Sequence, residues 1–178
     1  MGILEKLRGS TKGPPRVSSS EILWSWIGAF LGIGLLGWLA AAELAQEERF
    51  MLIGSFGASA VLLYGAPKSP LAQPRNVLGG HILSAFVGVA SYKLLAQEPW
   101  LASAIAVSTA IALMYITRTL HPPGGATALI AVIGGDKVHG LGFSYALAPV
   151  GVGASLMILV ALLVNNLPRQ RRYPEFWF

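Results

Sequence analysis

The chain of 178 residues contains no cysteine, and only 12% of its residues are charged. The absence of cysteine excludes disulfide bonds, thiolate metal sites and cysteine nucleophiles. A soluble domain carries roughly a quarter charged residues, whereas this chain is 54% hydrophobic. Since long apolar segments cross a bilayer as helices, the composition indicates an all-α integral membrane protein.

Catalytic and metal-binding patterns are also missing. The three histidines, His81, His121 and His139, are far apart and lack metal-ligand spacing, and there is no Gly-x-Ser-x-Gly or phosphate-loop motif. We therefore expect no enzymatic activity, no cofactor and no metal site. The net charge of +5 would suggest nucleic acid as the partner of a soluble protein. Here the basic residues cluster at the ends of apolar runs, so they indicate topology and contact with lipid headgroups instead.

Four apolar runs approach or meet the length of about 20 residues that a helix needs to cross a bilayer. They cover residues 22–42, 77–95, 100–117 and 146–167, and two shorter runs cover residues 50–66 and 124–135. We expect four long transmembrane helices plus two short or broken helices. They form a single membrane domain of residues 21–167, between a polar cytoplasmic tail (1–20) and a basic and aromatic cytoplasmic tail (168–178).

A break is predicted at the stretch Leu120-His-Pro-Pro-Gly-Gly-Ala-Thr-Ala128. Pro122 and Pro123 cannot donate backbone hydrogen bonds and disfavour a helical residue before them, so an incoming helix should stop near His121. Pro123 suits the first turn of a new helix. The stretch therefore predicts a break followed by a short helix with free first amides. In a membrane, protein or a water-filled cavity must cover such a break.

An internal repeat relates the two halves of the chain. Gly57-Ala-Ser-Ala60 matches Gly125-Ala-Thr-Ala128, and each is expected to follow a break and open a short apolar helix. Each half then contains a long span, a short helix and a long span, over about residues 22–96 and 99–167.

The basic residues favour one orientation of these halves. If all six runs cross the membrane with the N-terminus inside, ten basic residues lie inside and three outside. If the short runs re-enter instead, the counts are eight and five. The first arrangement is favoured, with re-entrant short helices as the alternative. Three crossings per half would invert the second half, an architecture found in many transporters.

Two motifs occur in order, Ser69-Pro-Leu-Ala-Gln-Pro-Arg-Asn-Val-Leu-Gly-Gly-His81 and His121-Pro-Pro-Gly-Gly-Ala-Thr-Ala128. With them, the sequence resembles the HPP family of small integral membrane proteins over about residues 20–167. Such proteins are usually described with four transmembrane helices, and plastid and cyanobacterial members are associated with nitrite transport. The resemblance implies a transporter or channel for a small inorganic anion. Because no transit peptide is evident, it points to the inner membrane of a bacterium, a cyanobacterium being one option.

Nitrite is a small, flat monoanion that free helix amides, a helix dipole and hydroxyl groups can stabilise. Two segments offer this combination, and we expect an anion site near the midplane between their helix N-termini, each contributing about 0.3–2 kcal/mol. Ordinary bonding of the two hydroxyls to their own helix backbone is the alternative. The expected binding residues are Gly57, Ala58, Ser59, Gly125, Ala126 and Thr127.

Further polar residues flank this expected site. His121 could bond the anion or carry a proton with it, and the alternative is that it caps the break. His81, a possible residue of the same pathway, could do either as well, although we favour for it a packing role in the first turn of its span. Arg75, Asn76 and Arg118 are expected at the inner mouth of the pathway, although an orientation signal alone would explain both arginines.

Other functions stay open. The chain could be a non-transporting scaffold whose small residues Gly28, Gly32 and Gly88 assemble oligomers, and a transporter could equally form a homodimer or homotrimer. Nitrate or formate could replace nitrite as the anion. The sequence does not separate a channel from a proton-coupled carrier.

Overall fold

Four long spans are present as expected, and the fourth begins earlier than predicted, at Asp136 instead of residue 146. The computed structural model describes residue 13, residues 15–43 and residues 54–178, and its regular elements are all helical within that part of the chain. The long helices are α2 (Ser19–Glu43), α4 (Pro74–Leu95) and α5 (Pro99–Ile116). A fourth long segment, Asp136–Val164, combines α7 (Asp136–Leu141), η3 (Gly142–Ala146), η4 (Leu147–Gly151) and α8 (Val152–Val164). These four segments are long and apolar enough to cross a membrane.

The two short apolar runs also form helices. Residues 54–60 are α-helical and continue into the π-helical turn η1 (Val61–Gly65), which precedes the 3₁₀ turn η2 (Pro70–Ala72). The second short helix, α6 (Pro123–Ile133), has 11 residues. At about 1.5 Å per residue it covers about half of a hydrocarbon core of roughly 30 Å. This helix therefore cannot cross a membrane by itself.

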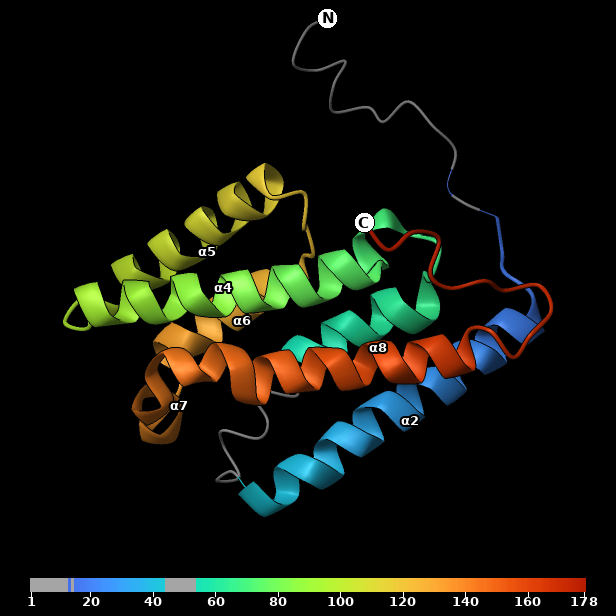
Figure 1. The fold of residues 1–178 in the computed structure, drawn as a ribbon, viewed down its shortest axis with the longest axis horizontal. Helices are drawn as coiled ribbons and strands as arrows, with labels where there is room; N and C mark the ends of the chain where they lie inside the picture. Colours follow the sequence, from blue (N-terminus) through green and yellow to red (C-terminus); the bar gives the residue numbers. More distant parts are fainter. Residues whose placement is uncertain (1–12, 14, 44–53) are drawn as a thin grey trace, which may run out of the picture.

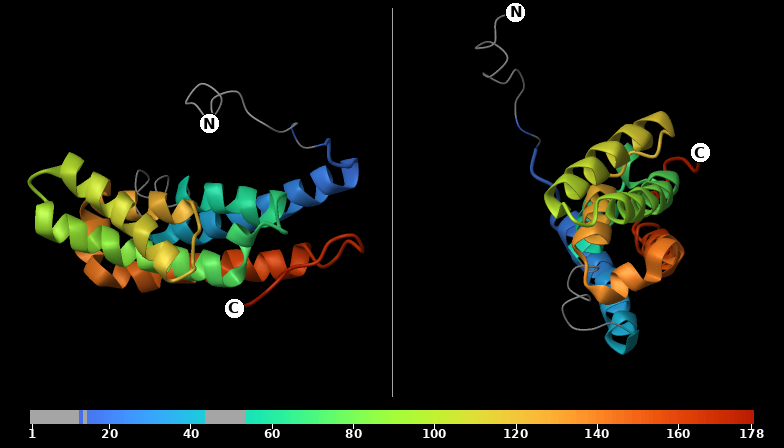
Figure 2. Two further views of the ribbon diagram at one scale, coloured as in Figure 1. Left: turned by 90° about the horizontal axis from the view of Figure 1, so that it is seen from above. Right: turned by 90° about the vertical axis from the view of Figure 1, so that its left-hand side faces the viewer.

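The long helices define two ends of the bundle. α2 and α4 begin at one end, where the C-terminal segment also lies, while α7 and the α4–α5 turn lie at the opposite end (Figure 1). The view from above in Figure 2 shows the same arrangement. The first end carries residues such as Arg75 in the first turn of α4 and Arg171, which pairs with Glu21 of α2. We call it the basic end, and the other the α7 end.

The chain turns back at the basic end after α5. The helix ends at Ile116, earlier than the predicted stop near His121, because Arg118 adopts a left-handed conformation (φ 57°). The Thr119 N–H donates to the Met114 carbonyl (2.8 Å) and the Arg118 N–H to that of Tyr115 (3.2 Å), which is a Schellman arrangement.

From there the chain follows α4 toward the α7 end. The two segments approach so closely that α4 needs glycines at the contacts. A Cβ at Gly80 would lie 2.8 Å from the Thr119 carbonyl oxygen, and one at Gly88 would overlap the Ala128 carbonyl. Val132, near the end of α6, packs in a cluster with Leu95 at the end of α4. The non-helical residues 119–121 and α6 after them therefore run along α4 from Gly80 to Leu95.

Small residues on α2 serve contacts within the chain. A Cβ at Gly28 would lie 2.7 Å from Cδ1 of Tyr64, and one at Gly32 would overlap the Tyr64 hydroxyl. Gly88 packs in the same way against Ala128. The interpretation that Gly28, Gly32 and Gly88 face another subunit is therefore wrong, because their surfaces are already occupied. Oligomerisation itself stays a prediction.

The C-terminal segment packs onto the basic end. Arg171, whose side chain is 1% exposed, pairs with Glu21 of α2 at 2.8 Å. It also donates to the Tyr64 carbonyl (3.2 Å) and to Oδ1 of Asn165 (3.0 Å). The Tyr173 hydroxyl donates to the Ala72 carbonyl at 2.9 Å. These contacts tie α2, η1, η2 and the end of α8 together.

Candidate functional site

Five polar side chains meet inside the bundle, where the two short helices contact each other. Each is at most 1% exposed. They come from the helix of residues 54–60, from α4, from the stretch before α6 and from α6 itself. We call them the polar cluster: Ser55, Ser59, His81, His121 and Thr127.

Short hydrogen bonds link the polar cluster. The Ser59 hydroxyl oxygen lies 2.7 Å from Nε2 of His81 and 2.9 Å from Nε2 of His121. On the other side of its ring, Nδ1 of His81 lies 2.7 Å from Oγ1 of Thr127. Oγ1 of Thr127 lies in turn 2.6 Å from Oγ of Ser55. The five side chains therefore form one continuous chain of hydrogen bonds.

The direction of these bonds follows from one carbonyl. Nδ1 of His121 lies 2.8 Å from the carbonyl oxygen of Leu71 in η2. A carbonyl can only accept, so Nδ1 carries the proton, and Nε2 of the neutral ring accepts from Ser59. Ser59 then accepts from Nε2–H of His81.

The remaining bonds point the same way. Because Nε2 of the neutral His81 ring carries the proton, Nδ1 must accept from Thr127. Thr127 then accepts from Ser55. With both imidazoles neutral, every donor points from Ser55 toward Leu71. No buried side-chain nitrogen or oxygen of the described residues lacks a partner.

Local sequence explains why these groups meet. Ser55 and Ser59 are one helical turn apart and so share a face of their helix. Phe56 lies against the His81 ring, with centroids 5.0 Å apart, and has room because Gly153 of α8 has no side chain. On the opposite side Gly124 packs against Ser84 Oγ of α4. The cluster is enclosed by protein, as a helix break inside a membrane requires.

Comparison with known sequences places the chain in a family. Residues 14–174 match the family model of the HPP transmembrane region. The chain belongs to the HPP family. This HPP chain is an integral membrane protein, as its four long apolar segments also indicate.

Two curated relatives of this HPP chain are transmembrane proteins of Dictyostelium discoideum. One is 49% identical over 178 residues, covering 98% of the chain and 57% of the relative. The other is 46% identical over 173 residues, covering 96% and 60%. The HPP chain thus spans less than two thirds of these relatives. They are eukaryotic, so they do not support the bacterial source that the resemblance implied. No solved structure matches the chain.

The backbone donors of the HPP motif are not free. The N–H of Gly124 donates to the His121 carbonyl (2.8 Å) and that of Gly125 to the Pro122 carbonyl (3.0 Å). The expectation that α6 presents free first amides is therefore wrong at Gly124 and Gly125. The physical reason is that Pro122 already has helical backbone angles (φ −52°, ψ −38°), so the first turn closes by tight bonds to the third residue back.

The small residues of the expected site lie beside the cluster. Residues 54–56 are already helical, and the residues before them lie outside the described part of the chain, so the break expected before Gly57 stays a prediction. Ala58 is exposed, and Gly57 and Ala126 are partly exposed. A Cβ at Gly57 would meet nothing within 4 Å. No atom packs close enough there to require a glycine.

The two matching hydroxyls are in the cluster, together with two groups that sequence reasoning undervalued. Ser59 and Thr127 have longer contacts to their own helix backbone, 3.5 and 3.4 Å, than to the histidines. His81, for which a packing role was favoured, bonds both hydroxyls. Ser55 was missed, although its spacing of four from Ser59 places it on the same helix face.

Arg75, Asn76 and Arg118 lie at the basic end. Arg75 donates to the Thr117 carbonyl (2.9 Å) and Asn76 to that of Leu120 (2.9 Å), while Arg118 is exposed. The first two side chains hold the connection between α5 and α6 against α4. Their expected role at the mouth of a pathway stays a prediction.

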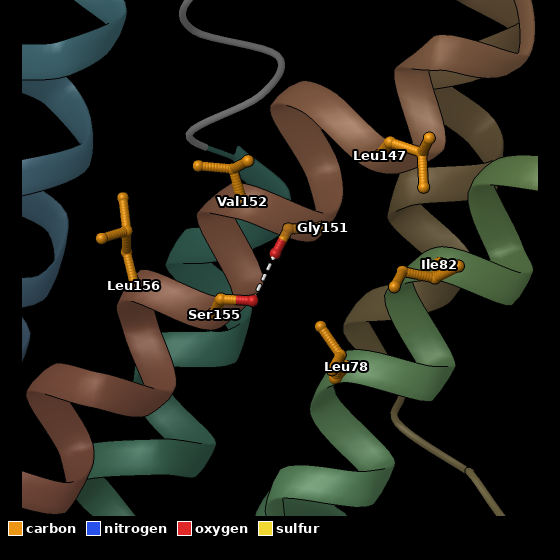
Figure 3. Close-up of a pocket in the computed structure, with 7 residues that line it drawn as sticks. All are labelled: Leu78, Ile82, Leu147, Gly151, Val152, Ser155 and Leu156. Carbon is orange, nitrogen blue, oxygen red and sulfur yellow. Dashed lines mark hydrogen bonds between the residues drawn. The ribbon is translucent and has the colours of Figure 1, made fainter.

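An apolar groove of about 380 Å³ lies between α4 and the start of α8 (Figure 3). Its single hydroxyl, that of Ser155, donates to the Gly151 carbonyl at 2.8 Å. It therefore offers no donor for an anion, and the polar cluster does not line it. Its lining residues are Leu78, Ile82, Leu147, Gly151, Val152, Ser155 and Leu156.

Proposed function

We propose that this HPP chain transports a small monoanion across the membrane and that the polar cluster is its binding site. The observation that carries the proposal is the complete burial of Ser59, His81, His121 and Thr127 at the meeting point of the two short helices. Polar and ionisable side chains are expensive inside a membrane and usually mark a pathway for ions or protons. Transport accounts for them better than catalysis does.

The directions of the short helices support this proposal. The helix of residues 54–65 and α6 meet through Ser55 and Thr127, near the start of each described helix. The first leads to the basic end, where the Leu63 carbonyl accepts from Asn165, and the second leads to the α7 end. We propose that they are equivalent members of two inverted repeats, whose binding sites lie where the broken helices meet.

In the described conformation the cluster is closed, since its groups bond to one another. An anion would have to replace bonds such as Ser59–His121, so that hydroxyl and imidazole donors turn toward it. Exchanging one set of hydrogen bonds for another gives a small net gain. Weak binding suits a transporter, because the ion must also leave. Nitrite is the anion we propose to test first, with nitrate and formate as alternatives.

We further propose that the basic end faces the cytoplasm, which would place both termini there. Seven of the basic residues in the described part of the chain belong to this end, whereas Lys93 and Lys137 belong to the α7 end. Cytoplasmic segments carry an excess of lysine and arginine. The seven are Arg16, Lys68, Arg75, Arg118, Arg169, Arg171 and Arg172.

Uptake of nitrite into vesicles containing the purified chain tests the proposal. Ser59→Ala removes the hydroxyl that both histidines share, and we expect the initial rate to fall about tenfold or more, since one lost buried hydrogen bond costs about 1–3 kcal/mol. Ser84→Ala is the matched control, because Ser84 is buried in α4 outside the cluster. Wild-type uptake no faster than in protein-free vesicles, for nitrite, nitrate and formate alike, would favour the scaffold instead.

A further inference from the structure

We propose that the polar cluster takes up one proton together with one anion, so that the two cross the membrane as an electroneutral pair. This inference rests on the proposed anion transport and adds the coupled ion. It is carried by the arrangement of hydrogen-bond donors and acceptors around His81 and His121, which has room for one added proton.

The partners of the cluster carry no formal charge. Within the described residues, its hydrogen bonds reach only its own members and the backbone carbonyls of Ser55, Leu71 and Pro123. Its titratable groups are the two imidazoles. One further titratable group faces it, the phenol of Tyr145 in η3, which donates to the Thr127 carbonyl at 3.4 Å. An anion arriving alone would therefore meet no compensating charge.

A single proton can be added without leaving any group unpaired. It binds the lone pair on Nε2 of His121, which then donates to the Ser59 oxygen instead of accepting from it. The Ser59 hydroxyl hydrogen rotates to the Ser55 carbonyl, 3.5 Å away. His81 continues to donate to Ser59 and to accept from Thr127. Adding the proton and rotating one hydroxyl thus gives the polar cluster one positive charge, and every group in it still has a hydrogen-bond partner.

A second proton is opposed by the first. The ring centroids of His81 and His121 are 4.9 Å apart, and two positive charges at that separation repel each other strongly in a medium of low dielectric constant. The cluster therefore holds one positive charge.

That charge matches one monoanion. A buried charge without a partner costs several kcal/mol, so neither the proton nor the anion is stable alone in the enclosed cluster. Together they are neutral, and they leave together: the proton departs from His121 and the Ser59 hydroxyl turns back. The expected stoichiometry is one proton for each anion.

The experiment uses vesicles that contain the full chain and a pH-sensitive dye, with equal pH on both sides before nitrite is added outside. Rates are taken relative to protein-free vesicles, because nitrous acid itself crosses lipid. Potassium with valinomycin sets the membrane potential. We expect the lumen to acidify by one proton per nitrite taken up, at a rate that does not depend on the potential.

Two variants locate the proton. His121→Gln keeps a neutral hydrogen-bonding group but cannot bind the added proton, so we expect coupled acidification to fall about tenfold or more. A glutamine at position 81 can still donate to Ser59 and accept from Thr127, so we expect His81→Gln to reduce acidification less. His139→Gln is the matched control, since His139 stacks on Tyr92 and bonds the Val132 carbonyl outside the cluster. Elution volume and thermal unfolding of each variant report whether it folds.

The outcomes separate the two proposals. Nitrite uptake that follows the imposed potential and leaves the luminal pH unchanged would overturn proton coupling while preserving anion transport, a result that needs no variant. No nitrite uptake above that of protein-free vesicles would overturn both. Unchanged acidification by folded His121→Gln would overturn the assignment of the proton to His121.

Discussion

The imidazole rings of His81 and His121 lie edge to face, 4.9 Å apart, and their Nε2 atoms share one hydroxyl. That hydroxyl has a single hydrogen, so with both rings neutral it can donate to one histidine and must accept from the other. The bond from His121 to the Leu71 carbonyl decides which. The two histidines therefore have opposite tautomers, although they are chemically identical side chains.

Thr127→Val tests whether the cluster contributes to stability as well as to transport. Valine has a similar shape but leaves Nδ1 of His81 without its donor, which is expected to cost about 1–3 kcal/mol. The melting temperature in detergent and the rate of nitrite uptake should both fall. Thr117→Val is the control, because Thr117 is exposed at the end of α5 and exposed substitutions usually change stability by less than about 0.5 kcal/mol. Wild-type stability and uptake in Thr127→Val would show that this hydroxyl is dispensable.

Gly32→Ala tests the packing of α2 against the first short helix. The added methyl group would overlap the Tyr64 hydroxyl, and overpacking of this kind costs about 1–3 kcal/mol. Gly34→Ala on the same helix is the matched control, since its Cβ would meet nothing within 4 Å and alanine is the better helix former by up to about 1 kcal/mol. Equal melting temperatures for the two variants would contradict the described contact.

Arg171→Gln tests how the C-terminal segment is attached to α2 at the basic end, through the ion pair with Glu21. Loss of Arg171 would leave Glu21 without its ion-pair partner and would remove one hydrogen-bond donor from each of the carbonyls of Tyr64 and Glu21. We expect a loss of about 3 kcal/mol, the lower part of the range for breaking a buried pair, because Glu21 is 30% exposed. Arg169→Gln, at an exposed position, is the control and should leave the melting temperature unchanged. A similar small effect for both would mean that the C-terminal segment is loosely attached.

Tyr173 should make the same end sensitive to alkali. Burial, reinforced by the neighbouring Tyr64, raises the pKa of Tyr173 above its ordinary value near 10. A raised pKa means that folding favours the protonated phenol, so its contribution is complete below about pH 10 and is lost as the pH rises further. As the pH is raised from 8, the melting temperature should therefore decline more steeply for the wild type than for Tyr173→Phe. Parallel declines would count against this role of Tyr173.

The long helices and the break could be predicted from sequence because they depend on local properties. Apolar length sets α2, α4 and α5, and Pro122 and Pro123 prevent α5 from continuing into α6. The end of α5 came earlier than predicted, since it depends on the left-handed conformation of Arg118, which few residues other than glycine adopt.

The site could be predicted only in part, because its members meet through tertiary packing. Ser59, Thr127 and His121 were predicted from the repeat and the motif, and all three lie in the cluster. The role of His81 depends on how α4 is rotated against the short helices, which one sequence does not reveal. The prediction of a free amide at Gly125 was wrong because this N–H donates to the Pro122 carbonyl and so closes the first turn.

Nitrogen-15 magnetic resonance of the histidine side chains in lipid tests the central claim most directly, because it reports which ring nitrogens carry protons. Without an anion, we predict that His121 is protonated at Nδ1 and His81 at Nε2, both rings being neutral. Nitrite should then produce one imidazolium in each chain. Identical tautomers at rest, or spectra that nitrite leaves unchanged, would contradict a cluster that binds a proton and an anion together.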